Sequence, residues 1–109
     1  MTERYSHLAS LLIDIECELR RALLWGTIEP TEDALASTEP FCVDTMSFQE
    51  WLQFVFLPRM HQLLAHQHPL PAQCNITAMA EMVWAGTPAA KQVIYALRKF
   101  DDCINDGTP

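Results

Sequence analysis

The spacing of apolar residues near the start of the chain constrains the fold most. Tyr5, Leu8, Leu12, Ile15, Leu19 and Ala22 recur at alternating steps of three and four. This spacing predicts an amphipathic helix of about six turns, because 3.6 residues complete one turn. No segment alternates apolar and polar residues between turn residues as a strand does, although Cys42-Val43 could be locally extended. The pattern therefore predicts an all-α protein.

A second helix is predicted to begin after Ser47. Ser47 and Glu50 stand three positions apart, just before Trp51, in the form of a reciprocal capping box. The helix is expected to continue to about His66. Pro58 lies inside it, where the ring removes a backbone donor and crowds the preceding turn, so a kink or a break is expected.

Two further helices are expected after the stiff Pro69-Leu70-Pro71 connector. The third runs from about Asn75 or Thr77 and stops at Gly86. The fourth is capped by Thr87, has Pro88 at its first position, and presents one buried stripe. That stripe consists of Val93, Leu97, Phe100 and Ile104.

The length of 109 residues bounds the chain to a single domain, residues 1–109, with one core. Half of the residues are hydrophobic, which supplies enough apolar surface for folding. The expected architecture is a four-helix bundle with a proline-kinked second helix and a flexible tail at 105–109. Its unusual feature is a long ordered crossover between the first two helices, at 27–46, where helix connections usually span about 2–8 residues.

The crossover changes character along its length. Its first half, Glu29-Pro30-Thr31-Glu32-Asp33, is acidic and expected to be solvated, whereas Phe41, Val43 and Met46 are too apolar to be left in water without a reason. One interpretation is structural: the crossover lies across the bundle, Phe41 and Met46 plug its end, and Asp44 or Thr45 satisfies backbone donors ahead of Ser47. The other is that part of this apolar surface contacts a partner protein.

Charge argues against a free-standing nucleic-acid-binding protein. The formal net charge is −7 and the sequence pI is about 4.8, so phosphates are repelled and a basic protein partner is favoured. The first residues lack the pattern of a signal peptide, and no apolar run approaches the length of a membrane span. A cytoplasmic protein without membrane association is expected.

Catalytic, metal and cofactor sites are not predicted. The four cysteines are scattered without a C-x-x-C pair, which indicates reduced, packed thiols. His61 and His66 are five positions apart, rather than the four that place two ligands on one helical face, and His66 and His68 fall where the second helix is expected to end. Asp44 is a lone acid beside a threonine before a helix, as a turn or capping residue would be.

Several short motifs resemble a known family. Ser37-Thr38, Pro40-Phe41, Asp44-Thr45-Met46, Glu50-Trp51-Leu52-Gln53, Pro58-Arg59-Met60 and Pro69-Leu70-Pro71, in this order and spacing, resemble the YqcC family of small bacterial proteins. The resemblance is strong from about Ser37 to Pro71. It implies an all-α YqcC-like fold and an association with tRNA pseudouridine synthase C, and family labels sometimes call these proteins the synthase itself.

These observations favour a non-catalytic accessory or binding protein, because a pseudouridine synthase needs a mixed α/β catalytic domain and a basic RNA-binding face. The expected partner is tRNA pseudouridine synthase C or another basic protein, without direct nucleic-acid binding. The candidate partner-binding residues are Phe41, Asp44, Met46, Trp51 and Arg59. Arg59 is expected to pair internally with Asp44 or, alternatively, with a partner's carboxylate. Two other hypotheses remain open: an enzymatic activity as the family label suggests, and a homodimer closed by the same apolar patch.

Overall fold

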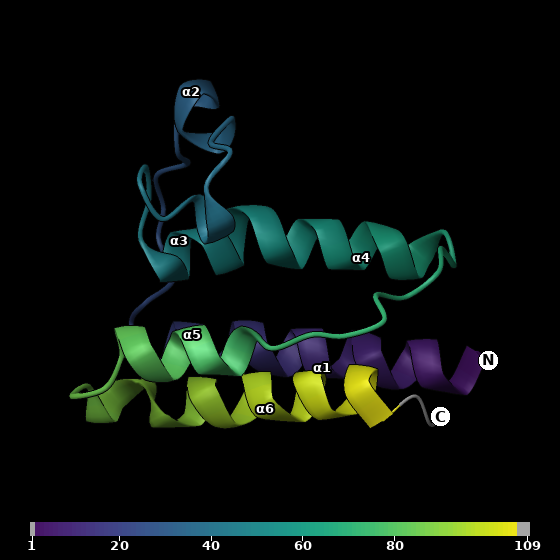
Figure 1. Ribbon diagram of the computed structural model, residues 1–109. Coiled ribbons are helices and arrows are strands. Elements are labelled where there is room, and N and C mark those ends of the chain that lie inside the picture. Colours follow the sequence, from purple (N-terminus) through teal and green to yellow (C-terminus); the bar gives the residue numbers. More distant parts are fainter. Residues whose placement is uncertain (1, 107–109) are drawn as a thin grey trace.

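All regular structure in the described part of the chain, residues 2–106, is helical (Figure 1). The computed structural model confirms the all-α prediction. In chain order its elements are α1 (Thr2–Arg21), α2 (Glu32–Leu35), the 3₁₀ turn η1 (Pro40–Cys42), α3 (Phe48–Trp51), the π turn η2 (Leu52–Phe56), α4 (Leu57–Ala65), α5 (Ile76–Val83), the 3₁₀ turn η3 (Pro88–Ala90) and α6 (Lys91–Asp106).

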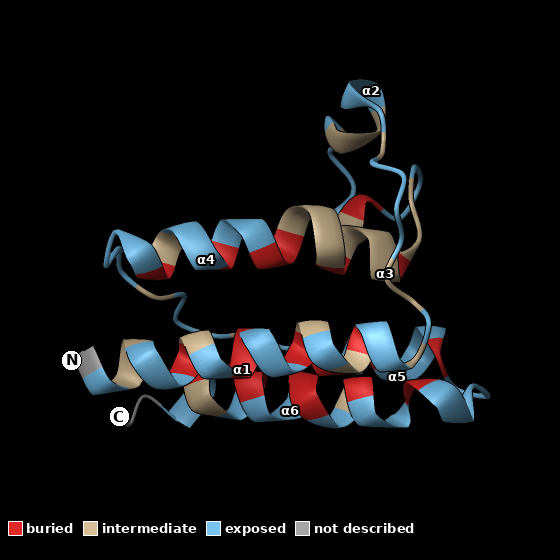
Figure 2. Cartoon of the chain, turned by 180° about the vertical axis from the view of Figure 1, so that it is seen from behind, coloured by how far each residue is buried: buried red, intermediate tan, exposed pale blue. Residues whose placement is uncertain are grey.

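One core joins the four predicted helices. α1 packs along α6 and also against α4, while α5 packs on α6 (Figure 1). The predicted stripe of α1 is confirmed, since Leu8, Leu12, Ile15 and Leu19 are fully buried. Figure 2 shows that the buried positions of α1, α4 and α6 face one another across the interior. The hydrophobic periodicity thus sets which face of each helix is removed from water.

The second helix begins where the capping box predicts. The Glu50 backbone N–H donates to the Ser47 hydroxyl at 3.2 Å, and the Ser47 N–H donates to the Glu50 carboxylate at 3.0 Å. Together α3, η2 and α4 carry the helix without a break to Ala65, with His66 as its C-cap.

The predicted proline distortion takes the form of the π turn η2. The Leu57 N–H donates to the Leu52 carbonyl, five residues back rather than four. Pro58 follows at once and has no N–H to offer the Phe54 carbonyl that its ring crowds. Widening of the preceding turn relieves that crowding, so the helix bulges instead of ending.

The last two helices differ from prediction at their ends. α5 stops at Val83, with Trp84 as C-cap, rather than at Gly86. The Thr87 side chain makes no cap hydrogen bond, and the Thr87 carbonyl instead accepts the N–H of Ala90 in η3. α6 continues through Asp106, so residues 105 and 106 are not part of a tail, and residues 107–109 lie outside the described chain.

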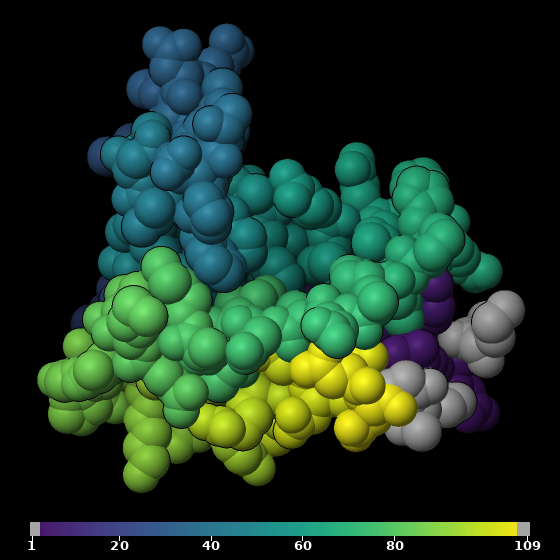
Figure 3. Space-filling view, in the orientation of Figure 1, coloured from purple at the N-terminus to yellow at the C-terminus, as the bar shows by residue number. Residues whose placement is uncertain are grey.

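The crossover, residues 27–46, projects from the body of the molecule. In Figure 1 α2 lies at the far end of this projection, beyond α3, and Figure 3 shows the same segment as a raised lobe at one end of the molecule. None of the residues of α2 is buried. The interpretation in which the crossover lies across the bundle is therefore correct only near Phe41 and Cys42, where the chain returns to the core.

Candidate functional site

The aromatic residues of the candidate patch, Phe41 and Trp51, pack on one another and are half-buried. The rings of Phe41 and Trp51 meet edge to face at 4.9 Å between centroids, and Phe41 lies 6.0 Å from Phe48. Phe48 is buried and also contacts Trp84 at 5.2 Å. Phe41 reaches this position through a left-handed backbone with φ of 58°, which is unusual for a bulky residue. This aromatic cluster attaches the crossover to the core.

Asp44 belongs to a hydrogen-bonded network within the crossover. The Ser37 hydroxyl donates to an Asp44 carboxylate oxygen at 2.6 Å and accepts the Glu39 N–H at 3.1 Å. The neighbouring Thr45 hydroxyl donates to the Ala34 carbonyl at 2.8 Å. The predicted role of Asp44 or Thr45 was to satisfy backbone donors before Ser47, whereas both side chains instead connect the two limbs of the crossover.

Met46 and Arg59 are the remaining candidate partner-binding residues, and they differ in burial. Met46 is half-buried, and Arg59 is exposed on α4. The ion pair expected between Arg59 and Asp44 does not form, since the salt bridges of the described residues are Arg20–Glu16, Arg21–Glu18 and Arg98–Glu81. Asp44 is bonded to Ser37 instead. The structure thus joins Phe41 and Trp51 directly, and leaves Asp44 and Arg59 as separate exposed groups.

A clamp fixes the chain where the crossover leaves the body. The Gly26 N–H donates to the Gln53 side-chain oxygen at 2.8 Å, and the Gln53 amide nitrogen donates to the Gly26 carbonyl at 2.8 Å. Beside it, the Arg20 guanidinium lies over the Trp25 ring at 4.5 Å. The crossover is therefore held at both of its ends.

Sequence reasoning missed a buried carboxylate in α6. Asp101 is only 4% exposed, and one of its oxygens accepts both the Thr77 N–H at 2.8 Å and the Thr77 hydroxyl at 2.6 Å. The other oxygen is buried without a hydrogen-bond partner in the described residues. The carboxylate thereby caps the N-terminus of α5 from a neighbouring helix. Its sequence signal was its place four residues after Leu97 and three before Ile104, within the buried stripe.

The same corner holds Cys74 in a protonated state. Burial, together with the nearby negative carboxylate of Asp101, raises the pKa of the Cys74 thiol to about 12, against a partial lowering by the Ile76 backbone. The Asn105 side chain clamps the Cys74 backbone, accepting its N–H and donating to its carbonyl, each at 2.8 Å. These contacts indicate a structural thiol.

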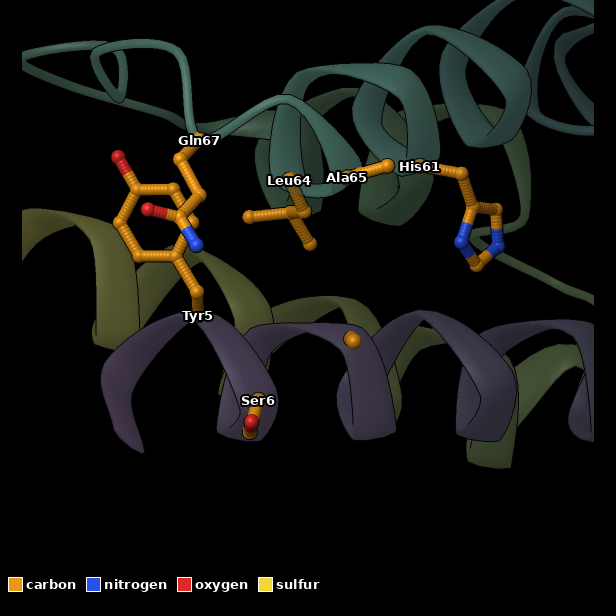
Figure 4. Close-up of a pocket in the computed structure, with 7 residues that line it drawn as sticks. Tyr5, Ser6, His61, Leu64, Ala65 and Gln67 are labelled. Carbon is orange, nitrogen blue, oxygen red and sulfur yellow. The ribbon is translucent and has the colours of Figure 1, made fainter. Parts of the chain in front are cut away.

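A shallow pocket of about 340 Å³ lies between α1 and the end of α4 (Figure 4). Its lining includes Tyr5, Ser6, His61, Leu64 and Gln67. Figure 4 places Tyr5 and His61 at opposite ends of the pocket, and the Tyr5 hydroxyl donates to the His68 carbonyl at 2.6 Å. Tyr5 and His61, the ionisable side chains of this lining, are not hydrogen-bonded to each other.

The described residues contain neither a cluster of metal ligands nor a helix suited to span a membrane. Between residues 2 and 106, no group of three or more His, Cys, Asp or Glu side chains converges as a metal site would require. His66 and His68 do stack, with ring centroids 5.6 Å apart. The helices within this range lack the combination of length and hydropathy that a membrane span requires.

Comparison with known proteins places these features in a family. The family described as "tRNA pseudouridine synthase C" matches residues 7–103. The solution NMR structure of protein YqcC from E. coli superposes with a TM-score of 0.87 at 34% identity, covering 100% of this chain and 93% of that one. An uncharacterized protein of Haemophilus influenzae is 34% identical over 87% of this chain and 90% of its own length.

One relative is much longer than this chain. A protein of Pectobacterium carotovorum subsp. carotovorum named "tRNA pseudouridine synthase C" is 43% identical over 83 residues. The match spans 76% of this chain but only 22% of that protein.

Proposed function

The chain belongs to the YqcC-like family, and on that premise we propose that it is a non-catalytic accessory protein that binds tRNA pseudouridine synthase C in the cytoplasm and takes part in tRNA modification. The interaction is docking of one protein surface on another. The enzyme supplies the chemistry, and this chain supplies a binding surface.

The observation that carries the proposal is the partial match to the Pectobacterium protein. There, a region 43% identical to this chain makes up 22% of a polypeptide named tRNA pseudouridine synthase C. In YqcC of Escherichia coli the corresponding region covers 85% of the whole protein. Related domains thus occur both within a synthase-named polypeptide and largely by themselves. A domain that is covalently joined to its partner in one protein often has to find that partner by binding in another, because only the linkage has changed.

Charge supports the same proposal. An enzyme that acts on tRNA needs a basic surface for phosphates, whereas this chain carries a formal charge of −7. Opposite charge accelerates association and makes it sensitive to salt.

The alternative function is a synthase activity of the chain itself, which the family description favours. Its test is tRNA pseudouridylation by the purified chain, with Asp44→Asn as the informative variant. Because Ser37, and no acid or base among the described residues, is the side chain bonded to Asp44, we expect no turnover by either form. Turnover by the purified wild-type chain that Asp44→Asn abolishes without unfolding it would favour the enzyme.

The direct test is calorimetric titration of this protein into tRNA pseudouridine synthase C from the same source, at 50 mM and 200 mM salt. Saturable binding that weakens at the higher salt is the expected result. Sizing of the mixture serves as the control, because a complex must co-elute. Absence of both heat and co-elution would overturn the proposal. Concentration-dependent sizing of this protein alone tests the homodimer hypothesis.

A further inference from the structure

The negative charge of the molecule is concentrated in the crossover. Residues 27–46 contain five carboxylates and no Lys, Arg or His, and so contribute −5 of the formal −7. Glu29, Glu32, Asp33, Glu39 and Asp44 are all exposed. The remainder of the chain is nearly balanced. These charges lie on the segment that forms the projecting lobe in Figure 3, where an unbalanced cluster of carboxylates attracts basic surfaces.

Exposed apolar side chains accompany these carboxylates. Ile28, next to Glu29, is 81% exposed, and Val43, next to Asp44, is 56% exposed. Leu23, in the turn after α1 and three residues before Gly26, is 90% exposed just outside the crossover. Apolar side chains beside charged ones on a projecting segment are the composition of a protein-binding surface with a polar rim.

Leu23 also has a backbone conformation that is unfavourable for a leucine. It lies two residues after the last residue of α1, in the left-handed region with φ of 60°, and the Leu24 N–H donates to the Leu19 carbonyl at 2.9 Å. This is the position of a helix-ending turn at which glycine is strongly favoured, because glycine has no Cβ. Leu23 makes the turn costlier without burying its side chain, and such local violations are expected at functional positions.

The crossover is held in shape although it is exposed. The Gly26–Gln53 clamp fixes its start, the Ser37–Asp44 and Thr45–Ala34 hydrogen bonds join its limbs, and Phe41 fixes its end in the aromatic cluster. These contacts hold the exposed segment in one conformation. Pre-organisation of an exposed surface lowers the entropy cost of binding.

We propose that the crossover, with Ile28 as its apolar contact and Glu29, Glu32 and Asp33 as its charged rim, docks onto a Lys- and Arg-rich surface of tRNA pseudouridine synthase C, and that Leu23, in the turn just before the crossover, adds a second apolar contact. This inference rests on the proposed function and assigns the surface that performs it. It replaces the candidate patch centred on Phe41 and Trp51, because those rings pack on each other and on the core.

The experiment compares two triple variants of equal charge. Glu29→Gln/Glu32→Gln/Asp33→Asn removes three charges from the crossover, and Asp14→Asn/Asp102→Asn/Asp106→Asn removes three exposed carboxylates elsewhere. Asp102 and Asp106 lie toward the C-terminal end of α6, which Figure 1 shows at the other end of the molecule from α2. Each is titrated into the synthase at two salt concentrations. We expect the Kd to rise about tenfold for the crossover variant and by less than about twofold for the control.

The apolar contacts are tested by two single substitutions. Ile28→Ser should weaken binding about fivefold, mainly through faster dissociation, and leave the salt dependence unchanged. Leu23→Gly should weaken binding while it raises the Tm, because it removes a contact and relieves the backbone. A higher Tm together with a lower affinity in Leu23→Gly would show that Leu23 serves binding and not folding.

The outcomes distinguish this inference from the proposed function. Suppose that the wild-type protein binds, that both triple variants lose affinity equally, and that Ile28→Ser and Leu23→Gly leave the affinity unchanged. The interface would then lie elsewhere, and the inference alone would be overturned. No binding by the wild-type protein would overturn both. Loss of binding only in the crossover variants, with circular dichroism unchanged, supports both.

Discussion

At the scale of single residues, the most consequential side chain is one that sequence reasoning passed over. Asp101 is buried, and a buried carboxylate is costly unless hydrogen bonds and a favourable dipole compensate for lost hydration. Thr77 supplies two hydrogen bonds at the start of α5. Charge-assisted hydrogen bonds of this kind connect α5 to α6 more specifically than apolar contact does.

Replacement of Asp101 by alanine should therefore destabilise the protein. Asp101→Ala removes both bonds to Thr77 and leaves the buried N–H without an acceptor, so we expect a loss of about 2–3 kcal/mol in the free energy of unfolding. Urea denaturation measures it. The control is Asp102→Ala, at an exposed position, for which a change within about 0.5 kcal/mol is expected. Equal effects of the two substitutions would contradict the capping role.

Cys74 makes the free energy of unfolding depend on pH in the alkaline range. Its pKa is raised from 9.0 to about 12 in the folded state, so between these values the unfolded chain has lost the proton while the folded chain retains it. Since the folded state then binds more protons, the free energy of unfolding falls as pH rises from 9 toward 12. Cys74→Ala should show a shallower fall. Urea midpoints of both forms at pH 7.5 and 10 provide the comparison, and parallel declines would count against it.

At the scale of elements, the sequence predicted a helix end correctly where the two residues that cap the end are close in sequence. Ser47 and Glu50 form the predicted capping box because both halves lie within one turn. Thr87 forms no side-chain cap, and Asp101 caps α5 from another helix. The π turn before Pro58 is likewise a local response to a local residue.

Removal of the capping box should lower stability by a moderate amount. Ser47→Ala leaves the Glu50 N–H without its acceptor, and we expect a loss of about 1 kcal/mol in the free energy of unfolding. Ser47→Asp restores an acceptor and should recover most of it. Thermal unfolding followed by circular dichroism measures both. A change no larger than that of Thr87→Ala, where no side-chain cap exists, would argue against the box as a stabilising feature.

At the scale of the whole molecule, the first turn of α1 is joined to the last turns of α6. The Arg4 guanidinium donates to the carbonyls of Cys103 and Ile104 at 3.2 Å each, across about a hundred residues of sequence. A cation at the C-terminal end of α6 also interacts favourably with the helix dipole. The body is thereby closed at one end, while the crossover projects at the other (Figure 1).

Loss of this closure should loosen the end of α6. Arg4→Ala removes hydrogen bonds from a cation to two carbonyls, so we expect a loss of about 1–2 kcal/mol in the free energy of unfolding. Amide hydrogen exchange in the last turn of α6 should accelerate, while the α3–α4 helix should be unchanged. Uniform acceleration in both helices would indicate that Arg4 does not act locally.

The sequence alone determined the helical class, the buried faces, the start of the second helix and the position of the proline distortion, because periodicity, capping and proline effects act within one or two turns. Tertiary structure alone decided the rest. Only contacts between distant segments could bury Asp101 against Thr77, join Gln53 to Gly26 and turn Phe41 toward Trp51. The same contacts direct the acidic half of the crossover outward, since the sequence records its charges but not the space around them.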